Sequence, residues 1–135
     1  MRPSFAAVES NYKRSGTHVC SMQFPNTCAI RMSEALAIAE PSLLSVFRSS
    51  GKNICPHGYV RGAQDLAAAL TEAWGRHDVG WNGGAGFHPS TSETGVICYM
   101  NIPGFSGQGH IDLLKSGSPV GEGYWSASPI WLWRL

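Results

Sequence analysis

The spacing of apolar residues changes along this chain, and the change limits the folds that it can adopt. Up to about residue 75, apolar side chains recur at the period of an amphipathic helix. After about residue 95, they form short runs divided by Gly, Pro and Ser, which is typical of strands joined by turns. Because the helical part comes first, the pattern predicts an α+β fold with N-terminal helices packed on an antiparallel sheet.

Capping and turn residues set the expected boundaries of these elements. Ser4 is suited to cap a first helix that ends near residues 15–16, and Asn26 or Thr27 to cap a second helix that runs to residue 39. Gly75 closes a third helix, and a short apolar segment precedes that helix. The third helix is predicted over residues 63–74, and the apolar segment that precedes it spans residues 43–47. The predicted strands span residues 95–100, 110–114, 124–126 and 130–134.

Residues 80–95 (GWNGGAGFHPSTSETG) are rich in Gly, Ser and Thr and show no apolar period. They predict a long mobile surface loop that is suited to serve as a lid or as one rim of a substrate site. Trp81 and Phe87 in this loop have two interpretations: they stack on a glycan or peptide substrate, or they pin the loop to the body of the protein.

Length and charge exclude several classes of protein. A chain of 135 residues predicts one domain over residues 1–135. The net charge is +1 and only 14% of residues are charged, so nucleic acid is not an expected partner. Near the start of the chain there is no apolar run that resembles a signal peptide or a membrane span. We therefore expect no membrane partner, synthesis in the cytoplasm, and secretion by a route that needs no signal peptide.

Cys28 stands where the second helix is expected to begin. A thiol at this place lies among backbone N–H groups without helical partners and at the positive end of the helix dipole, and both favour a thiolate. The same N–H groups, that of Cys28 included, are able to hold the oxyanion of a tetrahedral intermediate. The alternative is a small buried residue on an amphipathic helix, without a chemical role.

His110 follows a Gly-Gln-Gly sequence and opens a predicted strand. The glycines allow a substrate or another backbone segment to come close, so Gln108 and Gly109 are candidate substrate contacts. Alternation along the strand places His110 and Asp112 on the same side, where the imidazole is able to take the proton of the Cys28 thiol. The alternative is a His–Asp pair at the surface of an edge strand.

The group that orients His110 has two candidates. Asp112 lies on the correct side of the strand but is close to His110 in sequence, whereas Glu122 begins the next predicted strand and is able to reach sideways. With either carboxylate, the pattern predicts a cysteine hydrolase.

The remaining cysteines, Cys20, Cys55 and Cys98, admit one disulfide but do not identify its members. Their spacing matches no zinc template, although the Cys55-Pro56-His57 sequence would supply two ligands. We therefore expect neither a metal nor another cofactor.

Four stretches of the chain, taken in order, resemble one known family. They are NTCAIRMSEAL, CPHGYVRGAQDLAAAL, GQGHIDLL and PIWLWRL. Together they resemble the type VI secretion amidase effectors, fourth subfamily, over about residues 5–135. Such proteins are similar to NlpC-type papain-like amidases, in which a cysteine on a helix packs against an antiparallel sheet that bears the histidine. The resemblance implies a papain-like amidase domain.

By this resemblance, Cys28 is the nucleophile and His110 the base. The family's acid stands about eleven positions after the histidine, where this chain has Gly121 followed by Glu122, which implies a shifted glutamate. The resemblance also implies injection by the type VI secretion machinery into the periplasm of a target bacterium. There the protein would cut peptidoglycan stem peptides between D-glutamate and meso-diaminopimelate, and a cognate immunity protein would plug its groove.

Three other classes stay open from the sequence. A papain-like acyltransferase or transglutaminase would use the same thiol but pass the acyl group to an amine. A non-catalytic cell-wall-binding module would bind through its tryptophans and keep Cys28 in its core. A metal-dependent hydrolase would lose its activity to a chelator.

Overall fold

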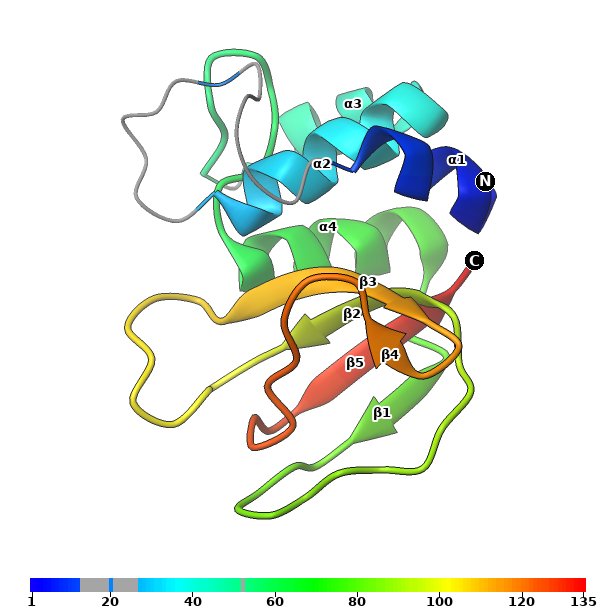
Figure 1. Ribbon diagram of the computed structural model, residues 1–135. Coiled ribbons are helices and arrows are strands. Elements are labelled where there is room, and N and C mark those ends of the chain that lie inside the picture. The colour runs from blue at the N-terminus through cyan, green and yellow to red at the C-terminus, as the bar shows by residue number, and fades with distance from the viewer. Residues whose placement is uncertain (13–19, 21–26, 52) are drawn as a thin grey trace.

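The computed structural model describes residues 1–12, 20, 27–51 and 53–135, and there four helices lie over one antiparallel sheet (Figure 1). The helices are α1 (Phe5–Asn11), α2 (Cys28–Ala39), α3 (Leu43–Ser49) and α4 (Ala63–Trp74). The strands are β1 (Val79–Trp81), β2 (Gly95–Tyr99), β3 (His110–Lys115), β4 (Ser118–Pro119) and β5 (Ile130–Arg134). The α+β class and the order of helices before strands are confirmed.

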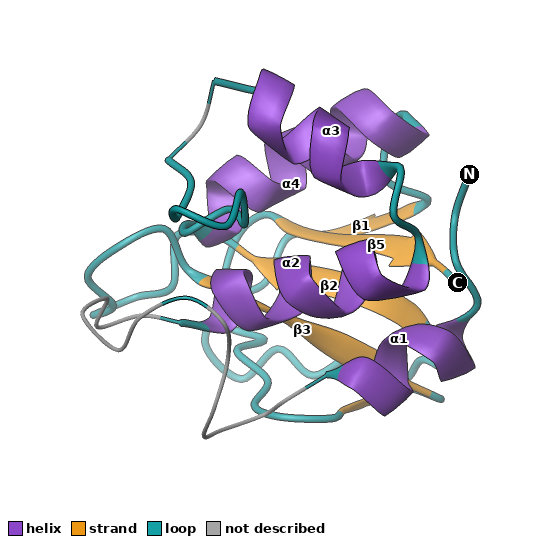
Figure 2. Cartoon of the chain, turned by 90° about the horizontal axis from the view of Figure 1, so that it is seen from above, coloured by secondary structure: helices purple, strands orange, loops and turns teal. Residues whose placement is uncertain are grey.

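The sheet has the strand order β1-β5-β2-β3-β4, and every neighbouring pair is antiparallel. Seen from above, the helices form one layer over it, with α2 packed on β3 and α4 on β2 (Figure 2). The segment between β1 and β2 runs across the opposite side of the sheet. None of the described helices combines the length and apolar content that a membrane crossing requires.

Alternation along β2 and β3 divides the core into two clusters. Val96, Cys98 and Ile111 face the helices and pack with α2 and α4, whereas Ile97 and Tyr99 face the other way. His110 pairs with Tyr99 in the register of β2 and β3, and Asp112 pairs with Ile97, so both side chains start from the face that turns away from the helices.

The edge of the sheet beyond β3 is incomplete. β4 pairs only with Leu114 and Lys115, at the end of β3. Among the described residues, the His110 end of β3 therefore has no strand on its outer side. At this open edge, a side chain from the helix layer is able to meet one that starts from the opposite face of the sheet.

One helical boundary differs from the prediction, and the apolar segment, to which the prediction gave no type, forms a helix. α1 ends at Asn11 and not near residues 15–16, because Tyr12 is extended (φ −82°, ψ 113°); residues 13–16 themselves lie outside the described part of the chain. The apolar segment 43–47 belongs to a helix, α3, because Leu43 and Phe47 stand one turn apart and bury the same side. Thr27 precedes α2 as predicted, while the other candidate cap, Asn26, lies outside the described residues.

The strand prediction fails at three places. Residues 124–126 form no strand, so Glu122 does not begin one; this segment instead packs against Gly83, where an added Cβ would lie 2.0 Å from the carbonyl oxygen of Trp125. β1 and β4 were not predicted. β1 includes Gly80 and Trp81 of the expected loop, and it forms because it pairs with β5, a partner far along the chain that local spacing does not reveal.

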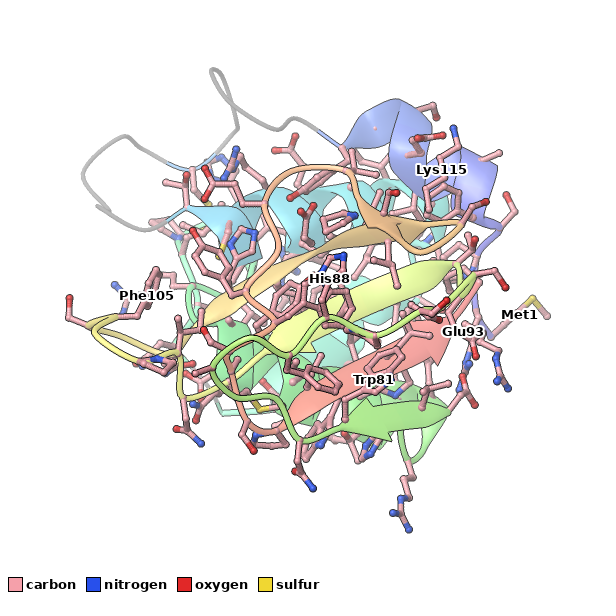
Figure 3. The ribbon with its side chains drawn as sticks, turned by 60° about the horizontal axis from the view of Figure 1, so that its bottom comes forward. Met1, Trp81, His88, Glu93, Phe105 and Lys115 are labelled. Atoms are coloured by element: carbon pink, nitrogen blue, oxygen red, sulfur yellow. A yellow bond between two sulfur atoms is a disulfide. The ribbon has the colours of Figure 1, made fainter. Side chains whose placement is uncertain are left out.

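In the remainder of the 80–95 segment, Phe87 and His88 pack against Trp125. The ring centroid of Trp125 lies 5.5 Å from that of Trp81 and 6.5 Å from that of Phe87. Figure 3, which brings this side forward, shows Trp81 and His88 against the sheet. Of the two interpretations of Trp81 and Phe87, the structure shows the one in which they pin the segment to the body.

A disulfide joins Cys20 to Cys55, whereas Cys28 and Cys98 are buried and belong to no disulfide. The bridge packs against Ile30, in the first turn of α2. It therefore ties the residues before α2 to the turn that begins at Cys55, where the N–H group of Gly58 donates to the Cys55 carbonyl oxygen.

Removing this disulfide is expected to lower the free energy of unfolding by about 3–4 kcal/mol, because the unfolded chain regains the freedom that a cross-link over 35 residues takes away. The variant replaces both Cys20 and Cys55 by Ser, and urea unfolding followed by tryptophan fluorescence measures the change. A reductant should destabilise the wild type by a similar amount and leave the double variant unaffected. An equal response of both proteins to the reductant would contradict the prediction.

Candidate functional site

The start of α2 holds Cys28 at the wall of a cavity. Thr27 is the N-cap residue, and its carbonyl oxygen accepts the first helical hydrogen bond, 2.9 Å from the Arg31 nitrogen. Cys28 is the first helical residue, so its N–H group is among those without a helical partner. Its side chain is only 3% exposed, and it lines the cavity.

The residue before His110, Gly109, packs closely against the backbone of β2, and this contact fixes where His110 begins β3. Gly109 has a positive φ of +98°, and an added Cβ would lie 2.1 Å from the carbonyl oxygen of Tyr99. The position therefore requires glycine. The imidazole of His110 stacks beside the Tyr99 ring, with centroids 6.2 Å apart, and meets the Tyr124 ring edge-on at 5.2 Å.

Asp112 lies behind His110 and is fully buried. Its Oδ2 atom is 3.7 Å from His110 Nε2, which makes an ion pair when the imidazole is protonated. Backbone N–H groups hold the carboxylate: Leu113 donates to Oδ1 at 2.8 Å and Gly121 to Oδ2 at 2.7 Å. The hydroxyl group of Tyr12, at the end of α1, donates a further hydrogen bond to it.

The two nitrogens of His110 face different partners. Nε2 is on the Asp112 side and has no hydrogen-bond partner among the described residues. The imidazole also hydrogen-bonds the Cys28 side chain. Because Nε2 faces Asp112, we infer that Nδ1 faces Cys28. The three side chains therefore follow one another in the order Cys28, His110, Asp112.

Burial and charge act in opposite directions on the pKa of His110. Burial lowers it, because a buried imidazolium loses solvation. The Asp112 carboxylate and the Cys28 side chain outweigh this effect and raise the pKa of His110 to about 9. At neutral pH the imidazole is therefore protonated, which is the form that pairs with a thiolate.

Glu122, the other candidate for the orienting acid, has a different partner. It is exposed, and its Oε2 atom accepts a hydrogen bond from the Tyr124 hydroxyl group. At the preceding position, an added Cβ on Gly121 would lie 2.8 Å from Asp112 Oδ2. The carboxylate of Asp112 thus occupies the space that a side chain at position 121 would enter.

The cavity has a volume of about 570 Å³ and lies at the open edge of the sheet. Its walls come from the start of α2, the end of α1, and the loops before β3 and after β4. The residues that line it are Tyr12, Thr27, Cys28, Arg31, Phe105, Ser106, His110, Gly121, Glu122 and Tyr124.

The predicted substrate contacts lie elsewhere. The Gln108 side chain caps α4: its Oε1 atom accepts from the Asp65 N–H group at 2.9 Å, and its Nε2 atom donates to the Asp65 carboxylate at 2.8 Å. Gly109 packs on β2, and Trp81 lies on β1 at the far edge of the sheet, well apart from Phe105 of the cavity wall in Figure 3. Among the described residues, these three do not line the Cys28 cavity.

The sequence prediction named Cys28, His110 and Glu122 of the cavity wall but missed others, Arg31 and Tyr12 among them. Arg31 had a usable signal, because three residues after Cys28 is the same side of a helix. Tyr12 had none, because its contact with Asp112 depends on how α1 packs against α2.

One cluster of potential metal ligands occurs among the described residues, and it lies outside this cavity. Its members are Cys20, Cys55 and His57, whose ligand atoms lie within 4.8 Å of one another. Both sulfurs are joined in the disulfide, which removes the two thiolates that zinc would need.

Comparisons with known proteins identify a family and a fold. A family model described as Type VI secretion system (T6SS), amidase effector protein 4 matches residues 24–133. No curated protein matches the chain. Among solved structures, the effector–immunity complex Tae4–Tai4 from Salmonella Typhimurium contains a chain 23% identical to this one, with a TM-score of 0.75 and coverage of 100% of this chain and 99% of that chain. The effector Tae4 from Enterobacter cloacae is 19% identical, with a TM-score of 0.72 and coverage of 100% and 98%.

The raised pKa of His110 is testable by NMR. In the wild type, the imidazole is expected to titrate with a midpoint of about 9. In Asp112→Asn the midpoint should fall, because the charge that opposes the effect of burial is removed. Glu122→Gln is the matched control and should leave the midpoint unchanged. A wild-type midpoint at or below the ordinary value of 6.5, or no change in Asp112→Asn, would show that Asp112 does not set the pKa of His110.

Proposed function

This chain belongs to the type VI secretion amidase effector protein 4 family, and we propose that it is a cysteine-dependent peptidoglycan amidase. The bond that it cuts joins D-glutamate to meso-diaminopimelate in the stem peptide. The observation that carries the proposal is the succession of Cys28 and His110 at the wall of one cavity with Asp112 buried behind His110. It supplies a nucleophile, a proton carrier and an orienting carboxylate in contact.

The architecture supports a papain-like, NlpC-type domain over residues 1–135. In such a domain the nucleophile begins a helix, the base lies on a strand of the sheet that the helix covers, and a polar side chain stands behind the base. Cys28 begins α2, His110 begins β3, and Asp112 lies behind His110. These positions support the papain-like assignment.

Acyl transfer through Cys28 begins from a thiolate beside the protonated His110. The thiolate attacks the carbonyl carbon of the scissile amide, and the oxyanion accepts from N–H groups at the start of α2. The protonated Nδ1 then gives its proton to the leaving amine as the C–N bond breaks, which leaves a thioester and a neutral imidazole. Water attacks the thioester and gives a proton to His110, and the C–S bond breaks to restore the thiolate.

Asp112 and not Glu122 orients His110 in this proposal. Asp112 faces Nε2, holds the imidazole with Nδ1 toward Cys28, and stabilises the imidazolium. Glu122 is exposed and engaged by Tyr124, so it belongs to the rim of the cavity.

The surroundings of the reaction follow from the family. A type VI effector of this kind leaves the cell through the secretion machinery and acts in the periplasm of a target bacterium. The Cys20–Cys55 disulfide supports this destination, because such bonds persist in oxidising compartments. A cognate immunity protein that covers the Cys28 cavity completes the proposal, and the relatives solved as effector–immunity complexes support it.

A wall-binding module without catalysis finds less support. Such a module would need exposed tryptophans, but Trp133 is fully buried and Trp125 is 8% exposed. They also lie in different clusters, on opposite sides of the sheet. Trp125 and Trp133 therefore do not belong to one binding face.

Digestion of purified muropeptides, read by mass spectrometry, tests the reaction. The wild type should release stem peptides cut after D-glutamate, and Cys28→Ala should lower the rate at least about 10³-fold, because the nucleophile is lost. Cys98→Ala, at the other cysteine outside the disulfide, is the matched control and should cut at nearly the wild-type rate. Activity that survives in Cys28→Ala would refute the cysteine mechanism. A product joined to an added amine would favour an acyltransferase. Inhibition by a chelator would favour a metal-dependent hydrolase.

A pair of neutralising variants separates the two acids. Asp112→Asn should lower kcat/KM at pH 8 by about 10²-fold, because the imidazolium is then neither oriented nor stabilised. Glu122→Gln should stay within about twofold of the wild type, since a rim carboxylate does not act on His110. The reverse order of the two effects would assign the role to Glu122. Circular dichroism on both variants verifies that they fold.

A further inference from the structure

One wall of the Cys28 cavity carries a positive charge that the chemistry above does not use. Arg31 lies on α2, three residues after Cys28, and lines the same cavity. Residues with this spacing share one side of a helix, with Cβ atoms about 5–6 Å apart. The Nε atom of Arg31 donates a 3.3 Å hydrogen bond to the carbonyl oxygen of Thr27, which holds the guanidinium beside the first turn of the helix.

The charges around Arg31 suit an anionic ligand. Of the charged side chains that line the cavity, His110 is protonated at neutral pH, and Glu122 accepts a hydrogen bond from Tyr124. Asp112 is buried behind His110, where two backbone N–H groups hold its carboxylate. The thiolate of Cys28 is balanced by the protonated His110, and Arg31 adds a positive charge on the α2 wall of the cavity.

The proposed substrate presents an anion at a matching place. D-glutamate is linked through its γ-carboxyl group to the next residue of the stem, so its α-carboxylate stays free and charged. Only the Cα, Cβ and Cγ carbons separate that carboxylate from the carbonyl carbon that Cys28 attacks. This span is comparable to the separation of two side chains one helical turn apart. A guanidinium binds a carboxylate through two parallel hydrogen bonds.

We propose that Arg31 is a specificity residue that binds the free α-carboxylate of the glutamate on the acyl side of the scissile bond. The inference rests on the proposed function, because it uses that cleavage position. Its consequence is discrimination between two kinds of stem peptide. When the α-carboxylate is amidated, as in D-isoglutamine, a neutral amide replaces the anion and the charge-assisted contact is lost.

The test compares two synthetic tripeptides, L-Ala-γ-D-Glu-meso-diaminopimelate and its D-isoglutamine analogue. The wild type should cut the glutamate peptide with kcat/KM about tenfold to hundredfold higher, the range expected for one hydrogen bond to a charged group. Arg31→Gln should abolish this preference by losing activity toward the glutamate peptide alone, and Arg31→Lys should keep part of it. Arg76→Gln, at an exposed arginine away from the cavity, is the matched control and should keep the preference intact.

Binding to an inactive protein separates this inference from the proposed function. Calorimetry with both tripeptides is done on Cys28→Ala, with and without Arg31→Gln. If the wild type cuts neither peptide but Cys28→Ala binds the glutamate form more tightly through Arg31, the cleavage assignment fails and the role of Arg31 stands. If Arg31→Gln weakens the binding or cleavage of both peptides equally, or changes neither, Arg31 does not read the carboxylate.

Discussion

The geometry of the cavity depends on one buried carboxylate, that of Asp112. Asp112 is fully buried, and a buried charged group is stable only when hydrogen-bond donors or opposite charges surround it. Here the donors are the backbone N–H groups of Leu113 and Gly121 and the hydroxyl group of Tyr12, which belong to β3, to the loop after β4, and to the end of α1. Because this carboxylate also faces His110, the contacts that join these three segments also orient the imidazole.

The incomplete edge of the sheet explains why the cavity lies where it does. His110 starts from the face that turns away from the helices, whereas Cys28 belongs to the helix layer. In the middle of a sheet, the strand backbone would separate two such residues. They meet because β4 covers only the far end of β3 and the start of α2 packs over the uncovered end.

Local spacing predicted the elements whose signals are contained within themselves. The apolar stripes of α2 and α4, the place of Thr27 before Cys28, and the alternation of β5 were all readable. β1 and the Cys20–Cys55 pairing were not, because each depends on a partner distant in sequence. The prediction that Gln108 contacts substrate was wrong for a similar reason. It relied on the closeness of Gln108 to His110 in sequence, whereas the Gln108 side chain caps α4.

The glycine at position 121 has a consequence for how this chain is related to others with the same fold. An acid introduced at this position would bring a second carboxylate into the space that Asp112 already fills, because a single added carbon would lie 2.8 Å from Oδ2. Two such groups repel at short range, and one of them would remain protonated. We therefore expect a chain with this fold to carry its acid either on the loop after β4 or on β3, and not at both positions. The two positions are expected to change together in evolution, as a coupled pair.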